Sequence, residues 1–196
     1  ALSPETFTAD FAGSLRSGTN ALRAAIDAVN SGSLKKVLVL AADCRLGMPN
    51  GANEVAFGDG AAALLIGSDG VLASIDSMYT MADEIIDVFR SDKDRFVHAW
   101  ETRFVRDYGQ GRIIPMAVTN ALQKSKLAVA DVAKYVMYAP DQRQLQTVAK
   151  SLKLDPAKVQ DSFFNEFGDT GTAQVFISLA AALEQAKAGD KVVLAS

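Results

Sequence analysis

Residues 57–67, FGDGAAALLIG, decide the fold because they join a Gly/Asp turn directly to a continuous apolar strand. Glycine supplies the positive φ angles that a tight turn needs, and the aspartate side chain can close the turn. The run that follows has no alternation of apolar and polar residues, which is typical of a strand buried on both faces. We therefore predict an α/β fold in which helices cover apolar strands on both sides.

The residues before this turn predict a helix and a strand, and the same order returns at the end of the chain. Within residues 17–42, apolar side chains between Ala21 and Val29 recur at helical spacing, Gly32 stops the helix, and VLVLAA is a buried-strand run. In the last segment a helical pattern is followed by Gly189 and then by KVVLAS. Superposing the two glycines places LRAAID over LAAALE, so we predict two related βα halves.

The repeat divides the chain into a first half, residues 1–69, and a second half, residues 70–196. A charged and aromatic insertion without clean periodicity lies at about residues 81–112. We predict a strand at 71–79, VLASIDSMY, and a short one at 162–164, SFF. The chain has no initiator Met and its last apolar run lacks a closing turn residue, so we expect an internal fragment truncated at both ends.

Composition excludes several classes of function. With 20 Lys and Arg against 23 Asp and Glu, the net charge is -3, and no basic block predicts a nucleic-acid partner. The single cysteine, Cys44, excludes an internal disulfide and suits a reducing compartment. No apolar run is long enough to span a membrane, and no CxxC, HExxH or carboxylate cluster predicts a metal site. We expect a cytoplasmic protein without membrane, nucleic-acid or metal partners.

Three loops are the places where chemistry is expected. In α/β folds, ligands bind beyond the carboxyl ends of strands and at helix N-termini, where free N–H groups favour negative charge. Residues 12–19, 138–142 and 168–172 are loops of this kind.

The motifs resemble those of the thiolase-like superfamily, above all 3-hydroxy-3-methylglutaryl-CoA (HMG-CoA) synthases and 3-oxoacyl-ACP synthase III. AFGDGAAALLIG matches the family's FGDGAAA pattern almost letter for letter, and RSGTNAL, YVMYAPDQRQLQTVAKSL and FGDTGTA resemble other family motifs in the same order. The resemblance implies a thiolase-like layered fold with two pseudo-repeated halves. It also implies an acyl-CoA acyltransferase of the Claisen-condensing type, without a permanently bound cofactor, that forms homodimers and sometimes assembles with thiolase and zinc-ribbon/OB-fold proteins.

The three catalytic positions that the resemblance implies hold other residues in this chain. Leu15 stands at the family's Cys position, and a leucine cannot attack a thioester. Tyr138 stands at the His position, or Ala139 if the loop is one residue shorter, and neither offers an imidazole. Asp169 stands at the Asn position, where a carboxylate would repel an oxyanion.

Three functions therefore stay open, of which the third is a scaffold that binds no ligand. The first is a non-catalytic or complex-forming member of the family. The second is an active condensing enzyme that uses Ser14, Tyr138 and Asp169, with Ser14 as a substitute nucleophile. A serine in a turn or helix cap needs no such role. The only histidine that could serve as its base, His98, lies in the insertion.

A weak binding prediction concerns the start of the helix after Tyr138. Asp141, Gln142 and Arg143 could bind an anion or the pantetheine amide of coenzyme A, and a solvated helix start would explain them equally well.

Overall fold

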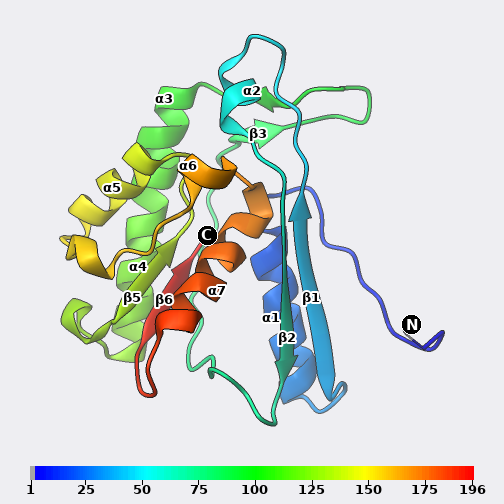
Figure 1. Cartoon of the computed structure of the whole chain (residues 1–196), viewed down its shortest axis with the longest axis vertical. Helices are drawn as coiled ribbons and strands as arrows, with labels where there is room; N and C mark the ends of the chain where they lie inside the picture. The colour runs from blue at the N-terminus through cyan, green and yellow to red at the C-terminus, as the bar shows by residue number, and fades with distance from the viewer. Residues whose placement is uncertain (1–2) are drawn as a thin grey trace.

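The computed structural model describes residues 3–196 and shows helices and strands alternating along the chain (Figure 1). The helices are α1 (Ser17–Asn30), α2 (Ala52–Ala56), α3 (Thr102–Phe104), α4 (Gly111–Ser125), α5 (Gln142–Ser151), α6 (Phe164–Phe167) and α7 (Gln174–Gln185). The strands are β1 (Lys36–Asp43), β2 (Gly60–Gly67), β3 (Val88–Phe89), β4 (His98–Ala99), β5 (Lys134–Met137) and β6 (Val192–Ala195). A π-helix, Val105–Gln110, joins α3 to α4.

The described strands pair two by two. β1 runs antiparallel to β2, with Lys36 opposite Gly67 and Asp43 opposite Gly60. β5 runs parallel to β6, as expected when a helix connects two strands, and β3 and β4 form a small antiparallel hairpin.

The elements stack in layers around two apolar clusters (Figure 1). Helix α7 lies between the β1–β2 pair and the β5–β6 pair, with α1 beside it against β1. Helices α4 and α5 cover the other side of β5. The clusters contain the largest of the fully buried side chains, among them Tyr135, Leu145, Val148 and Phe176.

The expected two-sided burial holds for β5 but not for β1 within residues 3–196. Tyr135 and Val136 on β5 are fully buried. On β1, Val39 and Ala41 face α1 and α7, whereas Leu38 and Leu40 are 52% and 67% exposed. The outer face of the β1–β2 pair is therefore apolar and open in this structure.

The predicted repeat is visible as a recurring helix, glycine and strand. Helix α1 ends at a turn where Gly32 has φ +75° before β1, and α7 ends at a turn where Gly189 has φ +91° before β6. Positive φ angles of this kind are readily adopted only by glycine, which explains why both turns carry one.

Two strand predictions were wrong. Residues 71–79 form no strand, and single side-chain contacts such as the hydrogen bond from Lys124 Nζ to the Met78 carbonyl hold them to the surface. Residues 162 and 163 lie in a loop, and Phe164 is the first residue of α6. Apolar composition favoured strands at both places, but a strand also needs a neighbour with free backbone groups. Among the described residues, no helix has the length and apolar character needed to cross a bilayer.

Candidate functional site

The three loops that the sequence singled out meet at one place. The Tyr138 hydroxyl donates a hydrogen bond to Asp169 Oδ2 at 3.2 Å, which joins the second loop to the third. The Gly18 N–H donates to Thr172 Oγ1 at 2.9 Å, which joins the first loop to the third. Leu15 packs against the apolar cluster that contains Tyr138. The structure thus brings Leu15, Tyr138 and Asp169 into one region.

Glycines allow the two halves to approach so closely. Phe57 and Asp169 form a bridge of parallel type, in which the Asp169 N–H donates to the Ala56 carbonyl at 2.7 Å. The Gly58 N–H donates back to the Asp169 carbonyl at 3.1 Å. A Cβ atom at Gly58 would overlap the carbonyl oxygen of Phe167. The FGDG turn of the first half and the FGDTG loop of the second therefore interlock through their backbones.

A buried ion pair fills the centre of this region. Arg45 Nη2 lies 2.8 Å from Asp169 Oδ1 and also donates to the Asp169 carbonyl oxygen at 2.9 Å. The side chains of Arg45 and Asp169 are only 9% and 4% exposed. The guanidinium also lies 3.4 Å from Asp43 Oδ2 and 4.1 Å from the centre of the Phe57 ring. Sequence reasoning missed Arg45, although its place just after β1 is a position where ligand-binding residues often lie.

Carboxylates of the chain itself occupy the amides at the start of the last long helix. The Gly171 N–H donates to Asp169 Oδ1 at 2.9 Å, and the Thr172 N–H donates to Asp43 Oδ2 at 3.3 Å. Such N–H groups favour negative charge, which makes them natural donors to an oxyanion. In this structure they already have anionic acceptors.

The environment also suppresses proton transfer by Tyr138. Burial first, and then the negative charge of Asp169, hold the pKa of Tyr138 well above its ordinary value, although Arg45 opposes the effect. Burial lowers the pKa of Arg45, but the charges around it, chiefly Asp169, outweigh burial and raise that pKa. Tyr138 is therefore held neutral and Arg45 charged at any physiological pH.

The substitute nucleophile has no base beside it in the described residues. Ser14 is exposed, and its hydroxyl accepts a hydrogen bond from the Arg16 N–H at 3.2 Å, as turn serines do. His98 lies in β4, where its Nε2 atom is 3.4 Å from Asp94 Oδ1 and its ring stacks on Phe89.

The residues considered for coenzyme A binding lie at the start of α5. The Asp141 carboxylate caps this helix by accepting a hydrogen bond from the Gln144 N–H at 2.7 Å. Gln142 accepts a long hydrogen bond from the Ser162 hydroxyl at 3.5 Å, and Arg143 is exposed. None of the hydrogen bonds of the described residues links these three side chains to the Arg45–Asp169 pair.

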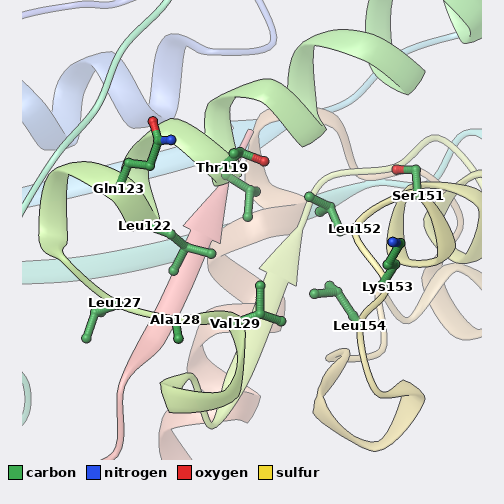
Figure 2. Close-up of a pocket in the computed structure, with 11 residues that line it drawn as sticks. Thr119, Leu122, Gln123, Leu127, Ala128, Val129, Ser151, Leu152, Lys153 and Leu154 are labelled. Atoms are coloured by element: carbon green, nitrogen blue, oxygen red, sulfur yellow. The ribbon is translucent and has the colours of Figure 1, made fainter.

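A cavity of about 350 Å³ lies elsewhere, between the C-terminal ends of α4 and α5 (Figure 2). Its wall is mostly apolar, with Leu122, Val129 and Leu154 around it and Lys153 at its edge. It shares no lining residue with the three loops. Over residues 3–196, no group of three or more His, Cys, Asp or Glu is arranged to hold a metal ion.

Comparison with known proteins shows which family the chain resembles. The family model for 3-oxoacyl-[acyl-carrier-protein] synthase III matches residues 9–83, and the model for the C-terminal part of that enzyme matches residues 122–196. The chain belongs to the thiolase-like superfamily.

Curated relatives of this thiolase-like chain are hydroxymethylglutaryl-CoA synthases. The protein of Pyrobaculum aerophilum is 27% identical over 98% of the chain and 55% of the relative. The protein of Thermococcus onnurineus is 28% identical over 98% of the chain and 56% of the relative. The chain thus spans little more than half the length of the relatives it matches.

Solved structures share the fold. The 3-oxoacyl-[acyl-carrier-protein] synthase III of Aquifex aeolicus has a TM-score of 0.82 at 20% identity, covering 96% of this chain and 62% of that one. An HMG-CoA synthase crystallised with CoA has a TM-score of 0.78 at 20% identity, covering 89% and 49%. The thiolase-like layered architecture expected from the motifs is confirmed.

Proposed function

We propose that this chain is a non-catalytic or complex-forming member of the acyl-CoA acyltransferase family that contains HMG-CoA synthases and 3-oxoacyl-ACP synthase III. The observation that carries the proposal is the buried contact of Arg45 with Asp169, with the Tyr138 hydroxyl on the same carboxylate. The three loops meet at this contact. The polar side chains there bind one another, so they are not free for a substrate.

Each step of acyl transfer lacks a group to perform it. The side chain of Leu15 has no nucleophilic atom, and the exposed Ser14 has no base to remove its proton. Tyr138 does not exchange a proton near neutrality, because its pKa is well above the ordinary value. The amides of Gly171 and Thr172 are bound to carboxylates, so a developing oxyanion finds no free donor there.

The proposal includes ligands and partners by extension from the family. One structural neighbour is an HMG-CoA synthase complexed with CoA, which supports an acyl-CoA thioester as a ligand here, with Asp141, Gln142 and Arg143 nearest its pantetheine or phosphates. No permanently bound cofactor is part of the proposal. We extend it to a homodimer in the cytoplasm that assembles with thiolase and zinc-ribbon/OB-fold proteins.

Acyl transfer is tested by incubating the protein with isotope-labelled acetyl-CoA and measuring its intact mass, followed by peptide mapping. We expect no adduct other than slow, non-enzymatic acetylation of the exposed Cys44, which a Cys44→Ala variant removes. An adduct on Ser14 that disappears in Ser14→Ala would overturn the proposal and favour an active enzyme with altered residues.

Ligand binding is tested separately by calorimetry with coenzyme A. We expect binding that weakens severalfold in Arg143→Ala and not in Arg23→Ala, a matched exposed arginine on α1. Equal affinities in both variants would argue against a coenzyme A site at the start of α5. No binding at all would contradict the proposed ligand and favour a scaffold that binds no coenzyme A.

A further inference from the structure

The cavity between the ends of α4 and α5 lies in the wall of the apolar cluster that covers β5 (Figure 2). Val118 and Leu122 of α4 line it together with Leu154, which follows α5, and all three are at most 8% exposed. The cavity has a volume of about 350 Å³, and its other lining residues include the exposed Ala128 and Val129. It therefore has a floor of buried core side chains and a mouth open to solvent.

Both helices end at this cavity in the same way. The Leu127 N–H donates to the Leu122 carbonyl at 3.0 Å after α4, and the Leu154 N–H donates to the Ala149 carbonyl at 3.0 Å after α5. In this type of helix ending, the chain turns through a left-handed residue and the next residue packs its apolar side chain back onto the helix. Here those apolar residues are Leu127 and Leu154, which both line the cavity. Hydrogen-bonded turns therefore hold its two sides in place.

Lysines stand at the left-handed positions of these turns, where glycine is usual. Lys126 has φ +56° and Lys153 has φ +54°. Among the described residues neither lysine forms an ion pair, and the carboxylates of Asp131 and Asp155 accept hydrogen bonds from backbone N–H groups of their own turns instead. A cation complements the dipole at the end of either helix. Only Lys153, however, lines the cavity, so only this lysine offers its charge to a ligand there.

The interior of the cavity favours an aliphatic chain over water. Its polar lining residues, Thr119, Gln123, Ser151 and Lys153, are all exposed, so the buried part of the wall is apolar. Water held against apolar side chains has few hydrogen-bond partners, and an apolar chain that displaces it gains free energy. An apolar cavity of about 150 Å³ holds benzene, so one of about 350 Å³ accommodates a chain of about eight carbons.

We propose that this cavity binds a straight-chain carboxylic acid of about eight carbons, with its aliphatic chain against Val118, Leu122 and Leu154 and its carboxylate at Lys153. One lysine balances the single charge of a carboxylate, whereas the second charge of a phosphate would face the carbonyl ends of α4 and α5 without a partner. The inference goes beyond the proposed function and does not depend on it, because the cavity shares no lining residue with the three loops.

Equilibrium dialysis against radiolabelled octanoate, below its micelle concentration, tests the proposal directly. We expect saturable binding of one octanoate per chain. Competition with unlabelled acids is expected to show that affinity rises about threefold for each methylene group from butanoate to octanoate, because each group buries more apolar surface. We also expect 1-octanol, which has the same chain without the charge, to bind more weakly than octanoate. Uptake that does not saturate, or affinity that does not depend on chain length, would overturn the proposal.

Three variants assign the binding to this cavity. Lys153→Gly removes the cation and suits the left-handed backbone, so we expect a folded protein that binds octanoate roughly fivefold more weakly and 1-octanol unchanged. Lys126→Gly makes the same change outside the lining and is expected to keep the native affinity. Val129→Trp fills the cavity from a residue that is 39% exposed, and we expect it to abolish binding of both probes.

Thermal unfolding verifies that each of these variants is folded. Equal losses of octanoate affinity in Lys153→Gly and Lys126→Gly would overturn the proposal, because the lining would then make no difference. Native affinity in Val129→Trp would also overturn it, because octanoate would then bind elsewhere.

Discussion

Arg45 Nη2 lies 2.8 Å from Asp169 Oδ1, in a buried ion pair between residues 124 positions apart in the sequence. The pair joins the end of β1 in the first half to the glycine loop before α7 in the second. Tyr138 adds a hydrogen bond to the same carboxylate. The contribution of this contact to stability is tested by removing one of its partners.

Replacing Arg45 with methionine is expected to destabilise the protein by about 3–5 kcal/mol, because Asp169 then keeps its buried charge without a cation. Urea unfolding measures the change. Adding Asp169→Asn to Arg45→Met is expected to recover a large part of the loss, since no uncompensated charge is left. The matched control is Arg23→Met: its partner Asp27 is exposed on α1, and the expected change is below about 1 kcal/mol. Equal effects at Arg45 and Arg23 would contradict a buried pair.

Tyr138 makes stability sensitive to alkaline pH. The folded protein holds the pKa of Tyr138 well above its ordinary value. The contribution of the neutral Tyr138 side chain to the free energy of unfolding is therefore fully present below about pH 10 and is lost as pH rises further. We expect the free energy of unfolding of the native protein to fall above about pH 10 more steeply than that of Tyr138→Phe. Tyr108→Phe, at an exposed site, is expected to keep the native slope. Matching slopes for the native protein and Tyr138→Phe would show that Tyr138 does not titrate with unfolding.

Gly58→Ala tests the interlocking of the two glycine loops. The new methyl group would overlap the Phe167 carbonyl, a backbone atom that cannot rotate away, so we expect a loss of about 3 kcal/mol or more. Gly67→Ala is the control, because a Cβ there meets its nearest neighbour at an ordinary 3.6 Å. Thermal unfolding of both variants gives the comparison, and a stable Gly58→Ala protein would exclude this close approach.

Cys44 is expected to be a slow thiol despite its exposure. The carboxylate of Asp59, by hydrogen bonding and by charge, raises the pKa of Cys44, so less thiolate is present near pH 8. Asp59→Asn is expected to speed alkylation by iodoacetamide roughly threefold, because the thiolate fraction increases. Asp69→Asn, an exposed change just after the end of β2, is the control. An unchanged alkylation rate in Asp59→Asn would show that Asp59 does not influence the reactivity of Cys44.

Local pattern sufficed for much of the fold. The apolar runs of β1 and β2 and the glycines at 32 and 189 were enough to predict both helix–strand units, because hydrophobic period and positive φ are local properties. The strand predicted at residues 71–79 failed for the opposite reason. Its composition suits a strand, but pairing depends on a neighbour that the segment does not have in the described structure.

The open face of β1 is a similar case. VLVLAA predicts burial on both sides, yet Leu38 and Leu40 are exposed in the structure while Val39 and Ala41 are packed. The sequence therefore records a preference for apolar surroundings, and the neighbouring elements decide whether it is met.

The sequence by itself predicts that a leucine, a tyrosine and an aspartate stand at the family's catalytic positions. It also determined that the loops carrying them follow strands or precede helices, because spacing along the chain is enough for that. Only the tertiary structure decided that Arg45 and Asp43 join Asp169. Ion pairing and pKa depend on distance through space and on exclusion of water, and neither can be read from the order of residues.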